Sequence, residues 1–402
     1  MSCLKSDETS LQEGIISMMK KLLLPLWVSA FFLLFLYSYT QVDLSLTLSR
    51  ASIIQTIEKG FQYIGWFNRP LSTYLYIGVF VFLFSLYFLT LRLISKSAIS
   101  STLIWRIIII ATVILAFSYT AFSRDIFNYI FDARIISFYH QNPYFHKALD
   151  YPGDPMLSFM HWTHRTYPYG PFWLVLTVPL TFIGNNFFLL TFFLFKFLMA
   201  GFFLITAWSI GKIAHILKLK NTLLPIAAFA LNPFVFTESL VSAHNDIVMM
   251  GMAMLGTYYI LRKERVKGSV LYVLSIGIKF VTALFIIGYF ILLGLSKTKY
   301  FIGLSIILMI VGVILAALRT NFQPWYLLYV VPFAVLMIEK QIVRYPLFIF
   351  SITNIIYYIP YLHEGSWNEP IPTFLNNLVL GATILSLFLV VGFLPFWRKV
   401  KK

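Results

Sequence analysis

The amino-acid sequence predicts an all-α protein, a polytopic transmembrane helical bundle of about 10–12 spans. Of its 402 residues, 59% are hydrophobic and only 11% are charged, and the mean hydropathy is +0.82. A soluble domain needs far more charge to cover its surface. Apolar segments of about 20 residues, the length of one helical crossing, recur along the chain. They are continuous rather than alternating, which favours helices over a β-barrel.

Ten segments are predicted to cross the membrane. In chain order they are Leu22–Tyr39, Leu71–Leu91, Leu103–Phe122, Phe187–Ile210, Thr222–Phe236, Ile247–Leu261, Phe301–Leu318, Trp325–Ile338, Tyr345–Pro360 and Thr373–Pro395. The stretch Ser269–Gly294 is too long for one crossing and too short for two, so we expect two half-depth helices that meet near Lys279. The apolar segment Pro171–Gly184 is short, so we expect a helix that lies at the outer interface or dips into it.

The positions of the basic residues predict the orientation of the bundle and argue against nucleic-acid binding. With the N-terminus inside, 21 of the 31 Lys and Arg residues fall on the cytoplasmic side, eight outside and two, Lys196 and Lys279, within the membrane. This asymmetry follows the positive-inside rule. Because the basic residues form short clusters between apolar spans, the net charge of +16 does not indicate nucleic-acid binding. Membrane lipids are the expected surroundings.

The domain organisation is predicted to be simple. No cytoplasmic loop is long enough to hold a folded domain, so residues 1–402 are expected to form one integral membrane domain. Residues 1–102 are predicted to form an N-terminal helical hairpin, and residues 339–402 a C-terminal one. The first span follows Lys20 and Lys21 without a small-residue cleavage site, so we expect a retained anchor rather than a removed signal peptide.

The longest predicted outer loop, Ser123–Gly170, holds most of the candidate functional residues. Asp125 follows the third span directly, so its carboxylate is expected at the membrane–water boundary. There it could accept a proton from the hydroxyl of a substrate that is carried by a lipid; alternatively, it only caps a surface helix. Aromatic residues such as Trp162 fit either an interfacial belt or a platform for sugar rings. The other candidate pocket residues of the loop are Arg124, Tyr129, Asp132, Arg134, Asn142, Tyr144, Tyr167 and Tyr169.

A second polar cluster follows the fifth span. Glu238, His244, Asn245 and Asp246 lie at the outer end of a membrane helix, so they are expected to face water or one another. They form either a solvated helix turn or part of a site. His244 and Asp246 could bind a divalent cation as a cofactor. Without a third ligand, however, the pattern for a metal site is weak. The sequence indicates no other cofactor.

Three cations lie within or near predicted spans. Lys196 and Lys279 are inside apolar segments, where a lysine costs about 2.5–3.5 kcal/mol and normally has a partner or lines a cavity. Arg319 lies near the outer end of its span, close to Trp325 and Tyr326, which are further candidate pocket residues. If the three cations point into one outer cavity, they would suit a phosphate. The alternative is that the lysine side chains extend to the headgroup region.

Four motifs in chain order carry a resemblance to a known family. They are Ser123-Arg124-Asp125 with Tyr129, Asn142-Pro143-Tyr144 with Tyr169-Gly170-Pro171, Asn232-Pro233 with Glu238 and His244-Asn245-Asp246, and Lys279 with Gln323-Pro324-Trp325-Tyr326. They resemble the GT-C membrane glycosyltransferases, and most closely the polyprenol-phosphate-mannose-dependent α-mannosyltransferases. The resemblance covers Leu103 to Ile338. It implies a GT-C-like catalytic module over residues 103–338, with a large first outer loop and juxtamembrane helices.

The resemblance implies inverting transfer of a sugar, most simply mannose, from a polyprenyl-phosphate donor to a hydroxyl of a lipid or glycan acceptor. The reaction would take place on the extracytoplasmic face of the cell membrane. Asp125, rather than Asp43, matches the acidic residue of the family and would be the general base. Lys196, Lys279 and Arg319 would hold the leaving phosphate. The family often has Gly where this chain has Ala133, which leaves the roles of Asp132 and Arg134 open.

Other classes of function are compatible with the same composition. A transporter or a flippase for lipid-linked sugars would also need many spans and buried lysines, but such folds often have repeated halves, and none is detectable in the sequence. A lipid-linked polymerase or ligase is chemically close to the transferase. The chain has no cytoplasmic domain and no Gly-rich loop for a nucleotide sugar, which favours a donor carried by a lipid.

Overall fold

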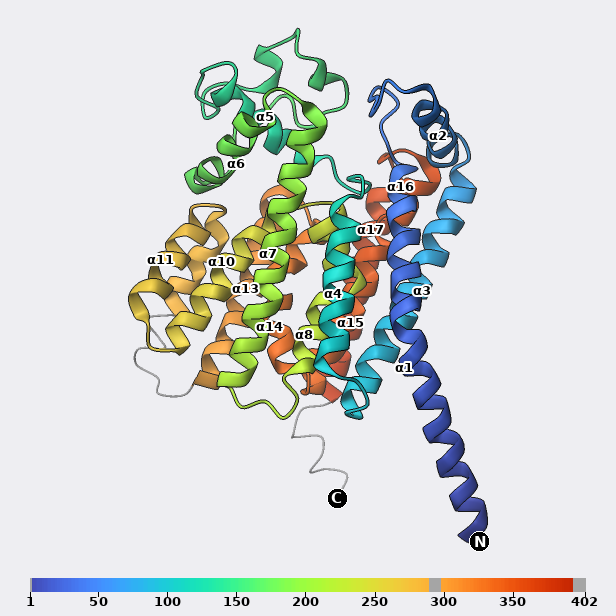
Figure 1. Ribbon diagram of the computed structural model, residues 1–402. Helices are drawn as coiled ribbons and strands as arrows, with labels where there is room; N and C mark the ends of the chain where they lie inside the picture. The colour runs from blue at the N-terminus through green and yellow to red at the C-terminus, as the bar shows by residue number, and fades with distance from the viewer. Residues whose placement is uncertain (1, 289–297, 393–402) are drawn as a thin grey trace.

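The computed structural model describes residues 2–288 and 298–392, which form a bundle of helices with no named β-strand (Figure 1). Six of the described helices are long and apolar enough to cross a membrane, or seven spans if a bent pair counts as one. They lie in α1 (Ser2–Tyr39), α3 (Arg69–Ser95), α7 (Phe188–Ile216), α13 (Thr298–Thr320), α15 with α16 (Gln341–Ile356 and Ile359–Glu364) and α17 (Ile371–Gly392). The predicted all-α polytopic bundle is confirmed.

Shorter helices complete the bundle and the long loop. Four apolar segments are shorter than a full crossing: α4 (Ser101–Ala116), α6 (Pro171–Gly184), α10 (Asp246–Leu261) and the irregular segment Pro324–Met337, which contains α14 (Val331–Ala334) between two 3₁₀ turns. The remaining helices used below are α2 (Ser52–Gln62), α5 (Asp125–Ser137), α11 (Arg265–Ile276), α8 (Leu223–Ala230) and α9 (Pro233–Phe236). The predicted bounds of Pro171–Gly184 agree with those of α6.

The expected span Thr222–Phe236 is not one helix. The axis bends by 52° between α8 and the segment that starts at Pro233. Pro233 has no N–H to continue the helix, and Asn232 caps the new helix by accepting a hydrogen bond from the Phe234 amide at 3.0 Å. The chain then continues as a π-helical turn, Thr237–Val241. This turn places Glu238 in the interior of the protein.

The expected break near Lys279 is confirmed in the described residues. α11 ends at Ile276, and Lys279 has an extended backbone before the 3₁₀ turn Phe280–Ala283. The last residues of the expected pair of half-depth helices, 289–294, lie outside the described part of the chain. Lys279 is therefore presented at the end of a helix rather than in the middle of one.

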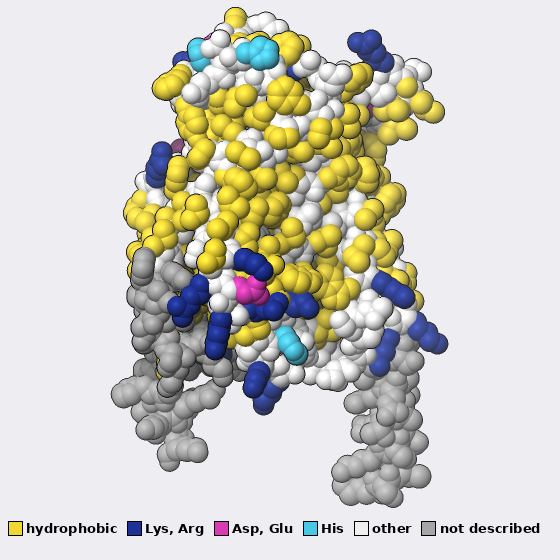
Figure 2. Space-filling model, turned by 60° about the vertical axis from the view of Figure 1, so that its left-hand side comes forward, with side chains coloured by type: hydrophobic (Ala, Val, Ile, Leu, Met, Phe, Trp, Pro, Cys, Tyr) yellow, Lys and Arg dark blue, Asp and Glu magenta, His cyan; other side chains and the backbone are white. Residues whose placement is uncertain are grey.

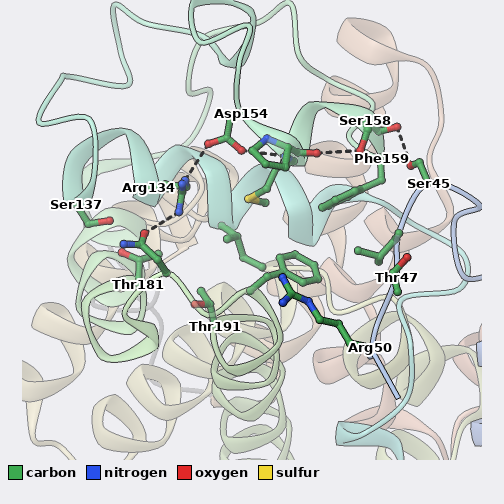
Figure 3. A pocket seen from close by; sticks show the side chains of 16 residues that line it. Ser45, Thr47, Arg50, Arg134, Ser137, Asp154, Ser158, Phe159, Thr181 and Thr191 are labelled. Atoms are coloured by element: carbon green, nitrogen blue, oxygen red, sulfur yellow. Dashed lines mark hydrogen bonds and ion pairs between the residues drawn. The ribbon is translucent and has the colours of Figure 1, made fainter. Parts of the chain in front are cut away.

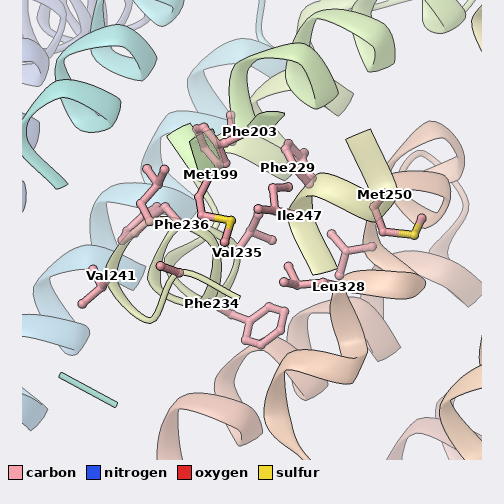
Figure 4. Close-up of a cluster of buried hydrophobic side chains, with 14 of the residues drawn as sticks. Met199, Phe203, Phe229, Phe234, Val235, Phe236, Val241, Ile247, Met250 and Leu328 are labelled. Carbon is pink, nitrogen blue, oxygen red and sulfur yellow. The ribbon is translucent and has the colours of Figure 1, made fainter. Parts of the chain in front are cut away.

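A tightly packed apolar cluster holds the bent segment in place (Figure 4). Met199 and Phe203 of α7 pack with Phe229 of α8, and all three are fully buried. Residues of α9, α10 and the segment around Leu328 complete the cluster. Because protein interiors pack at the density of organic crystals, these contacts leave the backbone of 233–241 little freedom to shift. The polar residues that follow are thereby held in defined positions.

The two ends of the bundle differ in charge and in structure. The long loop with α5 and α6 lies at the end opposite the N-terminus (Figure 1). On the face shown in Figure 2, hydrophobic side chains cover the middle, and basic side chains gather at the end away from the long loop. The connection between α7 and α8 at that end contains Lys218 and Lys220. This is the distribution that the positive-inside rule describes.

Candidate active site

Asp125 is the first residue of α5 and is almost completely buried, with 6% of its surface exposed. Its amide donates a hydrogen bond to the Ser123 hydroxyl at 3.1 Å. Its carboxylate accepts a hydrogen bond from the indole of Trp162, with 3.1 Å between Nε1 and Oδ1. Trp162 lies far along the long loop, so the loop folds back over α5. The carboxylate is thus part of a tertiary site and does not simply cap a surface helix.

His244 connects Asp125 to a second buried carboxylate. Its Nδ1 lies 3.6 Å from Oδ2 of Asp125, and its Nε2 lies 3.3 Å from Oε2 of Glu238. The imidazole ring stacks on Trp325, with 4.1 Å between ring centroids. The hydroxyl of Tyr358 donates a hydrogen bond to the other oxygen of Glu238 at 2.8 Å. His244 and Glu238 are both fully buried. These contacts fix the orientation of the imidazole.

The protonation states of the cluster follow from its charges. Burial opposes a charge on His244, but the neighbouring carboxylates of Asp125 and Glu238 outweigh it and raise the pKa of His244 to about 9. Burial likewise opposes ionisation of Asp125, but His244, Arg165 and Lys279 together hold the pKa of Asp125 below its usual value. At neutral pH the site therefore contains an ionised Asp125 beside a protonated His244.

A cavity of about 540 Å³ opens in front of Asp125. It lies between the loop residues 161–164, the start of α3 and the chain around α16. Four basic side chains line it: Arg69, Arg124, His161 and His164. Burial and the nearby Arg124 lower the pKa of His161, so His161 is neutral at pH 7. The cavity therefore combines one carboxylate with two permanent cations.

The two arginines in this cavity have different partners. Arg124 forms an ion pair with Asp43, at 2.5 Å between Nη1 and Oδ2. Arg69 lies over the Trp66 ring, with 5.5 Å from its Cζ to the ring centroid, and Arg124 lies 5.7 Å from the same ring. No acidic side chain of the described residues forms an ion pair with Arg69. Arg69 is thus available for an anionic ligand.

None of the three predicted phosphate-binding cations, Lys196, Lys279 and Arg319, lines this cavity. The buried ammonium group of Lys196 donates hydrogen bonds to Ser118 Oγ at 3.2 Å and to the carbonyl oxygens of Leu240 and Val241. Lys196 therefore joins α7 to the π-helical turn. Arg319 is exposed in the last turn of α13. Neither residue lines the cavity.

Lys279 belongs to a neighbouring polar cluster. Its ammonium group donates to both carboxylate oxygens of Asp246, at 2.7 and 2.8 Å, and lies 5.5 Å from the centroid of the Tyr169 ring. The Tyr129 hydroxyl donates to Asn245 Oδ1 at 3.4 Å, and the Tyr129 ring contacts that of Tyr169 edge-on. The structure therefore brings these predicted site residues together, and Asp246 neutralises Lys279.

Several predicted pocket residues shape the long loop instead. Asn142 accepts a hydrogen bond from the Tyr144 amide at 3.0 Å, and the Tyr144 hydroxyl donates to the Tyr169 carbonyl at 3.1 Å. The Tyr167 hydroxyl donates to the Gly170 carbonyl at 2.7 Å. The bond between Tyr144 and Tyr169 connects the middle of the loop to its end. None of these residues lines the cavity in front of Asp125.

Three further predicted pocket residues, Asp132, Arg134 and Tyr326, do not line the cavity in front of Asp125. Burial raises the pKa of Asp132 to about 7, and the charge of Arg165 only partly opposes this. Arg134 pairs with Asp154 at 3.0 Å, away from Asp125. Tyr326 shares a hydrogen bond with Thr320 at 2.6 Å. Asp132 and Arg134, whose roles the sequence left open, therefore have different charged neighbours.

Sequence reasoning missed Arg69, His161, His164 and Tyr358. Arg69 and Tyr358 lie in the segments predicted as terminal hairpins, outside the stretch with recognisable motifs. Their proximity to Asp125 depends on how those hairpins pack, which no local pattern reveals. Among the residues that the structure describes, no three His, Cys, Asp or Glu side chains are grouped so that they could hold a metal ion.

A polytopic helical bundle in which a long loop folds over a buried carboxylate fits the class of GT-C-type membrane glycosyltransferases. The chain belongs to the α-(1→6)-mannopyranosyltransferase family, whose N-terminal domain model matches residues 40–295. The α-(1→6)-mannopyranosyltransferase A of Corynebacterium glutamicum is 24% identical over 243 residues, which is 58% of this chain and 49% of that protein. The chain thus spans about half the length of this curated relative. No solved structure matches the chain.

Proposed function

We propose that the protein transfers a mannosyl residue from a polyprenyl-phosphate donor to a hydroxyl of a lipid or glycan acceptor, on the extracytoplasmic face of the cell membrane. One observation carries the proposal: an ionised Asp125 shares a cavity with the guanidinium groups of Arg69 and Arg124. A base and an anion site in one cavity are what this reaction needs. Membership of the family supports mannose as the sugar and favours a transferase over the transporter or flippase alternative.

The proposed reaction is a single displacement with inversion at the anomeric carbon. An oxygen of Asp125 accepts the proton of the acceptor hydroxyl while the hydroxyl oxygen bonds to C1 of mannose. The bond from C1 to the phosphate oxygen breaks, and the phosphate leaves with the bonding electrons. The carboxylate also lies close to the positive charge that develops at C1. General-base assistance of this kind contributes about 10²–10⁴-fold, and positioning adds to it.

His244 has a defined role in the proposed mechanism. It stays protonated between Asp125 and Glu238, so it keeps Asp125 ionised before the reaction. The same contacts orient the carboxylate toward the cavity. His244 does not reach the cavity itself and is therefore a positioning residue rather than a catalytic one.

The leaving phosphate is assigned to Arg69 and Arg124 rather than to Lys196, Lys279 and Arg319. Both arginines line the cavity, and none of the three other cations does. Arg69 has no acidic partner among the described residues, and Arg124 keeps further N–H groups beside the one that pairs with Asp43. A guanidinium group presents paired N–H donors that match the geometry of a phosphate. The two arginines would bind the donor and offset the charge that accumulates on its phosphate in the transition state.

The proposal is tested by supplying the full-length protein, reconstituted in vesicles, with two alternative radiolabelled donors. Polyprenyl-phosphate mannose is expected to support transfer to a mannoside acceptor, and a nucleotide-diphosphate mannose is not. Nuclear magnetic resonance of the product is expected to show an anomeric configuration opposite to that of the donor. Transfer from the nucleotide sugar alone, or retention of configuration, would contradict the proposal.

A further inference from the structure

A second cavity lies beside the long loop and has no part in the proposed reaction. Its volume is about 530 Å³, and it lies between the chain at 45–50, α5, residues 154–159, the end of α6 and the start of α7 (Figure 3). Hydroxyl groups are frequent on its wall. They belong to Ser45, Thr47, Ser137, Ser158, Thr181 and Thr191. The cavity is thus rich in groups that form hydrogen bonds.

The charges on this wall leave one cation without a counterion. Arg134 is neutralised by Asp154 at 3.0 Å and donates a further hydrogen bond to Asn186 at 2.8 Å. Arg50 also lines the cavity, and its guanidinium group reaches in among the other lining side chains (Figure 3). Among the described residues, no acidic side chain pairs with Arg50. The wall therefore carries a net positive charge that comes from Arg50.

The start of α7 adds to this positive potential. The helix has 29 residues and begins at Phe188, which lines the cavity, and no side chain caps its first turn. The dipole of a helix places partial positive charge at its N-terminus. An anion in the cavity would therefore be attracted by Arg50 and by the helix end together.

Exposed apolar side chains lie next to this cavity in the chain. Phe182, Ile183 and Phe187 are 60%, 61% and 72% exposed, and they adjoin the lining residues Thr181 and Phe188 in the chain. Exposed side chains of this size on a membrane protein suit contact with acyl chains. A ligand with an anionic head and apolar tails would match both surfaces.

The second cavity is separate from the cavity in front of Asp125. Asp43 lies between the two and lines neither of them. One of its oxygens accepts hydrogen bonds from the Ser45 amide and hydroxyl, at 2.9 and 2.6 Å, and the other pairs with Arg124. Ser45 belongs to the second cavity and Arg124 to the first. A ligand of the second cavity is therefore not the sugar donor held at Asp125.

We infer that this second cavity binds the phosphate headgroup of an anionic membrane lipid, with Arg50 as its main cationic contact. The hydroxyl groups of Thr47 and Ser137 donate to the phosphate oxygens, whereas those of Ser45, Ser158, Thr181 and Thr191 already donate to protein oxygens. The acyl chains run along Phe182, Ile183 and Phe187. The lipid phosphate forms no covalent bond. The site does not depend on the transferase proposal.

The test measures which lipids the full-length protein retains. Wild-type protein and the variants Arg50→Ala, Arg50→Lys and Lys59→Ala are released from nanodiscs of equal parts phosphatidylglycerol and phosphatidylcholine, and the bound lipids are counted by native mass spectrometry. Lys59 is the matched control because it is an exposed cation on α2 that lines neither cavity. Loss of charge-assisted hydrogen bonds predicts about tenfold weaker retention of phosphatidylglycerol in Arg50→Ala. Arg50→Lys should fall between this variant and the wild type.

Three results would overturn the inference. Equal retention by Arg50→Ala and the wild type would show that Arg50 holds no lipid. An equal loss in Lys59→Ala would show diffuse surface attraction instead of a site. Displacement of the lipid by millimolar inorganic phosphate would show a site for the free anion, because the acyl chains would then contribute nothing to binding.

Discussion

At the scale of single residues, the most unusual group is a histidine that carries a charge although it is buried. His244 lies between Asp125 and Glu238, and the two carboxylates raise its pKa to about 9. Breaking a buried ionic cluster is costly because it leaves an uncompensated charge. The cluster therefore links the stability of the site to the protonation of Asp125.

Replacing His244 should move the pH dependence of transfer. His244→Gln removes the positive charge that lowers the pKa of Asp125, so this pKa rises. Because Asp125 acts in its ionised form, the acidic limb of the profile of kcat/KM against pH should shift to higher pH. The profile is measured with reconstituted protein and the polyprenyl-phosphate donor. An unchanged acidic limb would mean that His244 does not control Asp125.

The same histidine predicts a pH-dependent stability. The pKa of His244 is higher in the folded protein than the ordinary value of 6.5. The stabilisation is therefore fully present below about pH 6.5 and is lost as the pH rises through about 9. Melting temperatures of the wild type in detergent should fall between pH 7 and 10. In His244→Gln this part of the decline should be absent, and an equal decline in both proteins would contradict the assignment.

Single residues also show what the sequence could and could not predict. Asp125, Glu238 and His244 were recognisable as polar groups at the ends of apolar segments. That His244 contacts Asp125 could not be predicted, because this contact brings together positions more than 100 residues apart. The partners of Lys196 could not be predicted, because two of them are backbone carbonyls of a π-helical turn, and side-chain patterns do not show such acceptors.

At the scale of elements, α6 is attached to α11 through a close backbone contact. The amides of Phe172 and Trp173 donate to the Gly277 carbonyl at 2.8 and 3.3 Å, and the Gly170 amide donates to the Ile278 carbonyl at 3.0 Å. A Cβ atom added at Gly170 would lie 2.3 Å from the Gly277 oxygen. The glycine of the Tyr-Gly-Pro motif is therefore needed for the approach of two backbones.

Gly170→Ala should destabilise the protein by separating α6 from α11. Overpacking of this kind costs about 1–3 kcal/mol, and the melting temperature in detergent is expected to fall. Gly78→Ala is the matched control, because a Cβ atom there meets nothing within 4 Å and alanine favours the helix. Equal melting temperatures for Gly170→Ala and the wild type would show that the close contact between α6 and α11 does not contribute to stability.

The elements differed in how well the sequence predicted them. The bounds of α6 were predicted from the apolar segment Pro171–Gly184, and in the structure Pro171 starts the helix and Asn185, with φ of 44°, ends it. The bend between α8 and α9 was missed, although Pro233 was visible, because the apolar composition continues across it. Apolar composition specifies burial, whereas the break depends on local backbone chemistry.

At the scale of the whole molecule, the account needs the long loop and the basic connections to lie on opposite sides of the membrane. Phe145, in the long loop, is 78% exposed, and Lys220 is exposed at the other end. In a Cys3→Ser background, which removes the single cysteine, a membrane-impermeant thiol reagent applied to intact cells should label Phe145→Cys and not Lys220→Cys. The reverse labelling would place the site on the cytoplasmic side.

The central claim, that Asp125 is the base of a sugar transfer, is tested most directly by Asp125→Asn. This change keeps the size of the side chain and an acceptor for Trp162 but removes the charge. Asp150→Asn is the control, since Asp150 is an exposed acid of the same loop. Mannose transfer from the polyprenyl-phosphate donor should fall at least about 100-fold in Asp125→Asn and stay unchanged in Asp150→Asn, with both proteins folded. Transfer by Asp125→Asn at the wild-type rate would contradict the account.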